Sequence, residues 1–106
     1  MMLEGLLGNK SAEKVMLALY AHEELHASAI AQMYDTALDP IKKQLERFEE
    51  SGFLIPRVVG RSRLYRFNDD HPMIESLKEL LAIAYKFEKK SSKKNIKREY
   101  RPTRDL

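Results

Sequence analysis

The chain has 106 residues, of which 43% are hydrophobic and 33% are charged, a balance typical of one soluble globular domain. No apolar run approaches the roughly 20 residues that a transmembrane helix needs, so we expect no membrane partner. The absence of cysteine excludes disulfides and thiolate metal sites. Together with a first segment that lacks the pattern of a secretory signal, it favours a cytoplasmic location.

The net charge of +3 hides an uneven distribution of basic residues. Residues 86–106 hold nine Lys or Arg and three Asp or Glu, so their net charge is positive. Residues 1–85 hold ten Lys or Arg and thirteen Asp or Glu, so their net charge is negative. Within the second group, residues 57–66 hold four arginines and no acid. Clustered positive charge is the usual footprint of nucleic-acid binding, although charge that merely aids solubility is the plainer alternative.

Residues 1–7 are apolar and short, and they predict a helical or extended arm. The first firm helix is predicted from Ser11 to His22, with Ser11 as its N-cap and with Val15 and Leu19 in its buried stripe. A second, shorter helix is predicted from Ala27 to Tyr34, before a polar break at residues 35–36.

The third helix is predicted to begin at Asp39-Pro40. Asp39 is a favourable N-cap, and Pro40 at the first helical position loses no needed hydrogen bond. Gly52 follows as the left-handed residue that ends the helix. Apolar residues recur at spacings of four and three, which places them on one buried face: Ile41, Leu45 and Phe48.

Two strands are predicted next, Phe53–Val58 and Arg63–Asn68, because both segments are rich in β-branched, aromatic and long aliphatic residues. Residues 59–62 form the predicted turn, in which Gly60 is free to adopt positive φ. Tyr65 and Phe67 alternate along the second strand, and we expect both in the core.

The last helix is predicted to carry Asp70 as its cap and Pro72 just inside its start. Its apolar residues repeat at spacings of 4, 3, 4 and 3, as in a heptad seam: Met73, Leu77, Leu80, Ala84 and Phe87. Ile74, Leu81 and Tyr85 widen the stripe. One flank is therefore expected to pack inward and the other to meet a second copy, which makes 72–90 a dimerisation helix.

The order helix, short helix, helix, hairpin, helix predicts a mainly α fold with a small β-hairpin, namely a winged helix-turn-helix with a C-terminal dimerisation helix. We expect residues 1–90 to form this DNA-binding domain. Residues 91–106 are polar and basic and contain a proline, so they are predicted to be a largely disordered tail.

The segment KKQLERFEESGFLIPRVVGRSRLYRFN, residues 42–68, resembles the ArsR-type winged-helix transcriptional regulators. GNKSAEKVMLALY, residues 8–20, resembles the first helix of that family, and residues 68–72 are similar to a subgroup found beside nucleotidyltransferase domains. The matching positions of the recognition helix and wing are Leu45, Phe48, Glu49, Gly52, Leu54, Gly60 and Tyr65.

The resemblance implies a regulator that binds double-stranded DNA. We expect it to act as a homodimer, whose two copies meet through residues 72–90 and the N-terminal arm. Lys43 and Arg47 are expected to share one outward face of the third helix, and Arg61 and Arg63 to flank the wing tip. Asp39 can also accept a hydrogen bond from a cytosine amino group, although an N-cap is its more typical role. The full set of expected DNA-binding residues is Asp39, Pro40, Lys42, Lys43, Arg47, Arg57, Arg61, Ser62 and Arg63.

Three acidic residues on the third helix, Glu46, Glu49 and Glu50, oppose this interpretation because they cancel its positive charge. A mixed, solvated helix face is the plain alternative. The alternative function is a protein-interaction module on the same fold, such as an accessory of a nucleotidyltransferase-like partner.

Little else in the sequence indicates chemistry. His22 and His26 are four residues apart but straddle a predicted helix break, so an exposed polar corner is favoured over a metal site. No nucleophile elbow, phosphate-binding loop or zinc-helix motif occurs. We therefore expect no catalytic residue, no cofactor and no metal, and we do not expect an enzyme.

Overall fold

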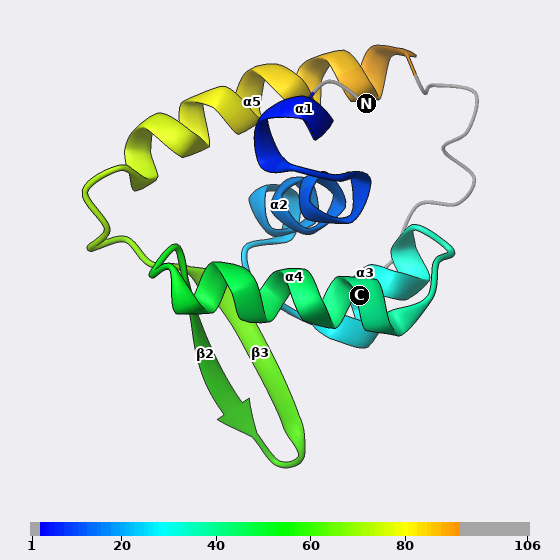
Figure 1. Ribbon diagram of the computed structural model, residues 1–106, viewed down its shortest axis with the longest axis vertical. Coiled ribbons are helices and arrows are strands. Elements are labelled where there is room, and N and C mark those ends of the chain that lie inside the picture. The colour runs from blue at the N-terminus through cyan, green and yellow to red at the C-terminus, as the bar shows by residue number, and fades with distance from the viewer. Residues whose placement is uncertain (1–2, 92–106) are drawn as a thin grey trace.

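The computed structural model describes residues 3–91, which form a helical body and a projecting β-hairpin (Figure 1). The predicted fold class is confirmed: the described part of the chain is mainly helical and carries a small antiparallel sheet. In chain order the elements are α1 (Glu4–Leu7), α2 (Lys10–His22), β1 (Leu25–His26), α3 (Ala27–Met33), α4 (Leu38–Glu50), β2 (Leu54–Val59), β3 (Ser62–Phe67) and α5 (Ile74–Ser91).

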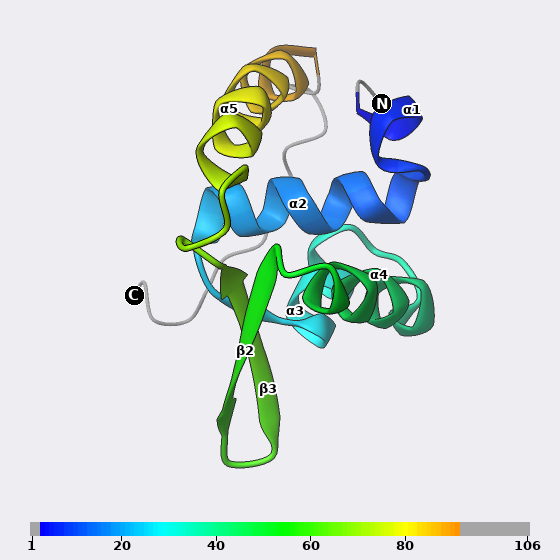
Figure 2. The same ribbon diagram turned by 60° about the vertical axis from the view of Figure 1, so that its left-hand side comes forward.

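Helix α2 lies at the centre of the body (Figure 2), with α4 on one side and α1 and α5 on the other. Val15 and Leu19 of α2 are fully buried, as the predicted stripe required, and so are Ile41 and Leu45 of α4. Burying a side chain of this size stabilises the fold by about 1.5–3 kcal/mol. The packing of α4 on α2 therefore fixes which face of α4 is left to solvent.

The start of α2 differs from the prediction, because Asn9 and not Ser11 is the N-cap. The Asn9 Oδ1 atom accepts a hydrogen bond from the backbone N–H of Ala12 at 2.7 Å, so the helix begins at Lys10. The arm before it is partly helical and is held by α2: the fully buried Glu13 carboxylate accepts from the N–H of Leu3 at 2.9 Å.

Helix α4 also begins earlier than expected. Ala37 occupies the N-cap position with extended backbone, and Leu38 is the first helical residue. Asp39 is consequently inside the first turn and makes no capping hydrogen bond, so its predicted role as the N-cap is wrong. Its carboxylate still favours the positive end of the helix dipole. Pro40 is the third helical residue, where an N–H has no intrahelical partner and its loss costs nothing.

The sheet has three strands in the order β1-β3-β2, and the sequence indicated only two of them. The short strand β1 pairs antiparallel with β3, where Leu25 lies opposite Tyr65. Strands β2 and β3 are each shifted by one residue from their predicted bounds, since Val59 pairs with Ser62 and the turn is only two residues long. Gly60 in that turn has φ +62°, as expected. Tyr65 and Phe67 are buried in the core, as predicted.

Helix α5 begins at Ile74, so both predictions for its start are wrong: Asp70 is not its cap, and Pro72 lies in the preceding turn and not inside the helix. That turn is organised differently: the His71 Nδ1 atom accepts from the N–H of Met73 at 3.0 Å. None of the described helices is long and apolar enough to cross a membrane. Apart from Ser91, which ends α5, the predicted tail lies outside the described residues.

The apolar residues of α5 divide between two faces. Ile74, Leu81 and Ala84 are buried against the body. Met73 and Phe87, the two ends of the predicted heptad seam, are more than half exposed. The predicted heptad seam therefore runs along the edge of the buried face. Ile74 and Leu81, which were expected only to widen the apolar stripe, make much of the contact with the body.

Gly52 offers a direct test of how α4 is ended. Its φ is +87°, a conformation that costs a residue with a Cβ atom roughly 1–2 kcal/mol, and an added Cβ would lie 3.4 Å from the His71 Cδ2 atom. We expect Gly52→Ala to lower the free energy of unfolding by about 1–2 kcal/mol in urea denaturation. Gly5→Ala, where an added Cβ meets nothing within 4 Å, is the control and should not destabilise. Equal stability of the two variants would contradict this account.

Candidate nucleic-acid interface

The α4 helix and the β2–β3 wing bound one face of the molecule, on the side of α2 opposite α5 (Figure 2). The buried stripe of α4 turns the next residues along the helix outward. Lys42 and Lys43 are exposed, and their side chains form no hydrogen bond or ion pair with any other described residue. Asp39 and Pro40 are exposed at the start of the same helix. The first two turns of α4 thus present two unpaired cations and one carboxylate.

Arg47 behaves differently from Lys43, although the two positions share a face of α4 as predicted. The Arg47 Nη2 atom donates to the backbone carbonyl of Leu7 at 2.8 Å, and the guanidinium lies 4.7 Å above the Phe48 ring centre. This hydrogen bond joins α4 to the end of α1, so the guanidinium already has a partner within the protein. Arg47 therefore fits a role in holding the N-terminal arm better than the expected role at DNA.

On the wing, Arg57 is engaged by a carboxylate from outside the hairpin. Its Nη2 and Nε atoms donate to the two carboxylate oxygens of Glu24 at 2.7 and 3.1 Å. The hydrogen bond from Arg57 lowers the pKa of Glu24 below its ordinary value, and the same bond raises the pKa of Arg57. Glu24 precedes β1, so this pair links the wing to the strand that the sequence did not reveal.

Arg63 is engaged on the opposite strand of the wing. Its Nη2 atom donates to both carboxylate oxygens of Glu49 on α4, at 2.8 and 3.0 Å, and its Nε atom donates to the Tyr65 hydroxyl at 3.1 Å. These hydrogen bonds, to Tyr65 first and to Glu49 second, raise the pKa of Arg63. Arg63 is therefore engaged within the protein, which its predicted place beside the tip did not indicate.

Arg61 and Ser62 lie at the tip of the wing, and both are exposed. Within the described part of the chain, Arg61 has no carboxylate partner. Its position at the tip agrees with the prediction, and its charge is not engaged by a described carboxylate.

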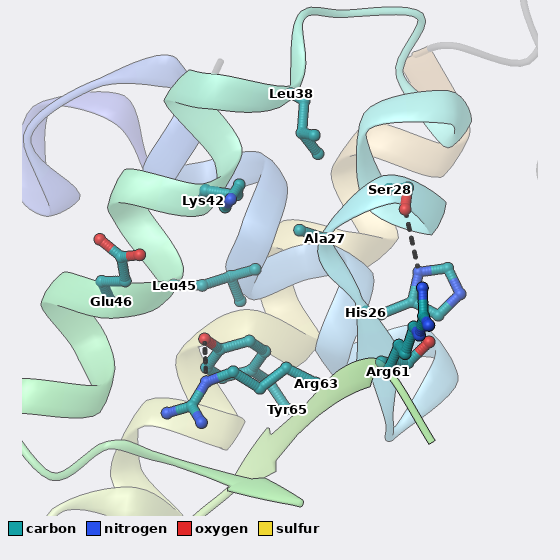
Figure 3. Close-up of a pocket in the computed structure, with 11 residues that line it drawn as sticks. His26, Ala27, Ser28, Leu38, Lys42, Leu45, Glu46, Arg61, Arg63 and Tyr65 are labelled. Atoms are coloured by element: carbon teal, nitrogen blue, oxygen red, sulfur yellow. Dashed lines mark hydrogen bonds between the residues drawn. The ribbon is translucent and has the colours of Figure 1, made fainter. Parts of the chain in front are cut away.

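A pocket of about 420 Å³ separates α3, α4 and the wing (Figure 3). Lys42, Arg61 and Arg63 contribute three cations to its walls, Glu46 contributes one carboxylate, and Leu45 and Tyr65 contribute apolar surface. The pocket therefore has an excess of positive charge and opens on the face where α4 and the wing meet.

Two further residues of this pocket, His26 and Ser28, were not expected at the site. His26 caps α3: its Nδ1 atom accepts from the N–H of Ala29 at 3.1 Å. In the neutral ring the proton is then on Nε2, which remains a donor. The sequence could have indicated both residues, because they lie at the start of the predicted second helix. Hydrogen-bond donors at the N-terminus of a helix often bind phosphate oxygens. Among the described residues no group of three or more His, Cys, Asp or Glu side chains is placed to hold a metal ion.

Comparison with solved structures identifies the architecture. The AntR antimony-specific transcriptional repressor matches with a TM-score of 0.62 and 21% identity, over 83% of this chain and 78% of that one. The disulfide-formed AbfR matches with a TM-score of 0.57 and 17% identity, over 90% of this chain and 74% of that one. The fold is a winged helix-turn-helix.

A MarR family transcriptional regulator from Silicibacter pomeroyi DSS-3 also matches, with a TM-score of 0.62 and 15% identity. The alignment covers 85% of this chain but only 63% of the regulator, so this chain spans less than two thirds of that protein. No protein-family model matches the chain, and a search of curated proteins returns no significant match. The closer resemblance to the ArsR type stays a prediction.

Lys43 and Arg47 form a matched pair for testing the site. We expect Arg47→Ala to weaken the docking of the arm, which urea denaturation would detect as a loss of about 1 kcal/mol, the usual worth of one hydrogen bond. Lys43→Ala should leave stability within about 0.5 kcal/mol, because an exposed side chain without a partner is removed. If Arg47→Ala proves as neutral as Lys43→Ala, the contact with Leu7 does not hold the arm.

Proposed function

We propose that this chain is a homodimeric, sequence-specific DNA-binding transcriptional regulator. The observation that carries the proposal is the shared cationic pocket, where Lys42 of α4 and Arg61 of the wing face one opening without carboxylate partners in the described chain. A winged helix-turn-helix fold with this charge arrangement suits DNA. Two of the structural neighbours, AntR and the MarR family protein, are transcriptional regulators, which supports the proposal.

In the proposed complex α4 enters the major groove by its first two turns. B-DNA has a major groove about 12 Å wide, which admits a helix about 10–12 Å across with its side chains. Lys42 and Lys43 then lie within reach of phosphates or guanine edges, while Asp39 and Pro40 lie at the leading end of the helix. Glu49 and Glu50 follow toward the C-terminal end, farther from the groove, whereas Glu46 lines the pocket one turn after Lys42.

The wing and the start of α3 lie side by side, because β1 pairs with β3, and together they meet the DNA backbone beside the inserted helix. Arg61 at the tip reaches a phosphate or the minor groove, with Ser62 beside it. The pocket receives one backbone segment, where the His26 Nε2–H donates to a phosphate oxygen. The Ser28 hydroxyl, whose long hydrogen bond to His26 Nδ1 measures 3.4 Å, turns from it to donate to the same phosphate. Most of the affinity is then electrostatic, and it depends steeply on salt.

Dimerisation uses the outer side of α5. Met73, Ile83 and Phe87 are each more than half exposed, and Leu80 lies between them on the same helical face. Exposed apolar stripes of this kind are typical of interfaces. Helix α1 lies on the same side of α2 as α5 (Figure 2), and its exposed Leu6 is assigned to the same proposed interface. A two-fold pair would present two α4 helices to half-sites about one duplex turn apart.

A salt titration tests the DNA interface. Binding to a random-sequence duplex, followed by fluorescence anisotropy, should weaken as NaCl rises. Arg61→Ala should reduce the slope of log K against log salt by about one unit, because one phosphate contact is lost. Lys86→Ala removes the same charge from α5, away from the proposed face, and should leave the slope unchanged. No detectable binding at low salt would contradict the proposal and favour the protein-interaction module.

A second experiment tests the dimer separately. Ile83→Lys places a charge in the exposed apolar stripe, whereas Glu75→Lys places the same residue on an exposed position of α5 outside it. Sedimentation equilibrium should give a dimer for the unaltered protein and for Glu75→Lys, and a dissociation constant at least about tenfold weaker for Ile83→Lys, since burying an unpaired charge is unfavourable. A monomeric unaltered protein at high concentration would refute this interface.

A further inference from the structure

Two of the four wing arginines are already bound by carboxylates in the free protein. Arg57 is held by Glu24, and Arg63 is held by Glu49. Neither acid belongs to the hairpin: Glu24 precedes β1, and Glu49 lies in the last part of α4. The wing therefore has an acidic partner on each of its two strands, contributed by the body of the protein.

We propose that Glu24 and Glu49 are intramolecular competitors of the DNA backbone, and that they set the affinity of the wing for phosphate. This inference rests on the proposed function. In the free protein the two carboxylates occupy the guanidinium groups of Arg57 and Arg63. When a duplex docks, each guanidinium exchanges its carboxylate for a phosphate, and the carboxylate returns to solvent.

The geometry of both pairs fits such an exchange. A carboxylate and a phosphate present a similar pair of oxygen acceptors to a guanidinium group, so each can replace the other. The Arg57 side chain is 59% exposed and the Arg63 side chain 49%, which leaves both open to an approaching strand. Exposed ion pairs are weak, and giving one up reduces DNA affinity by no more than about fivefold.

The Arg63 pair has an additional anchor. The Nε atom of Arg63 donates to the buried Tyr65, so the guanidinium keeps one fixed hydrogen bond when its Nη2 atom leaves Glu49. Arg57 has no such anchor, because its Nε and Nη2 atoms both bind Glu24. Arg63 therefore stays oriented at the wing throughout the exchange, whereas Arg57 is freed completely.

Glu50 provides the comparison that separates this role from general repulsion. It is exposed, it follows Glu49 directly in α4, and no arginine among the described residues binds it. All three acids repel DNA through space, but only Glu24 and Glu49 also occupy a phosphate-binding group. Removing either of these should therefore strengthen DNA binding beyond the gain from removing Glu50.

The experiment measures binding of a random-sequence duplex by fluorescence anisotropy over a range of NaCl concentrations. Glu24→Gln, Glu49→Gln and the control Glu50→Gln each remove one negative charge at nearly constant shape. We expect the first two to bind up to about fivefold more tightly than the control near physiological salt. Their salt slopes should also steepen by about one unit, because the arginine contact no longer frees a carboxylate that gathers cations.

A double-mutant cycle completes the test. Glu49→Gln in an Arg63→Ala background should gain no more affinity than Glu50→Gln does in the same background. Equal gains for Glu49→Gln and Glu50→Gln in the unaltered background would overturn the inference. Weaker DNA binding by Glu49→Gln would also overturn it, because the ion pair of Arg63 with Glu49 would then be needed to hold the wing in its binding position. Absence of binding by the unaltered protein and by every variant would instead contradict the proposed function, and this inference with it.

Discussion

The packing of α4 against α2 is the contact on which the rest of the structure depends. Ile41, Leu45 and Phe48 lie on one side of α4 because of its helical period, and all three are buried. Once that side is fixed, Lys42 and Lys43 must face solvent, and the chain leaving α4 must start the wing beside them. The juxtaposition of helix, wing and pocket follows from this one buried stripe.

Charge on the exposed face is balanced rather than accumulated. Glu24 and Glu49 engage two wing arginines, and Leu7 engages Arg47 through its carbonyl, so three of the expected DNA-binding cations have partners within the protein. Lys42 and Arg61, two of the expected DNA-binding cations without a carboxylate partner in the described chain, line the pocket between α4 and the wing. In the proposed complex, a single backbone segment of DNA meets these two cations.

The sequence was sufficient to predict the interiors of the helices and the hairpin. Apolar residues recur about every 3.6 positions along a half-buried helix and every second position along a half-buried strand, and both patterns can be read from the sequence. It was insufficient for the helix starts: Asn9 and Ala37 occupy the caps where Ser11 and Asp39 were expected, since neighbouring residues compete for one position. The two-residue strand β1 is too short for any period. The ion pairs of Arg57 and Arg63 join residues 33 and 14 positions apart, a separation that local patterns do not encode.

The central claim is that α4 and the wing, with the pocket between them, form a DNA-binding face. Amide chemical-shift changes in an NMR titration with a short random-sequence duplex at low salt test it most directly. The account predicts the largest changes at Lys42, Lys43, Arg61 and Ser28, and small changes along the exposed stripe of α5. Changes confined to α5, or no changes at all, would contradict it.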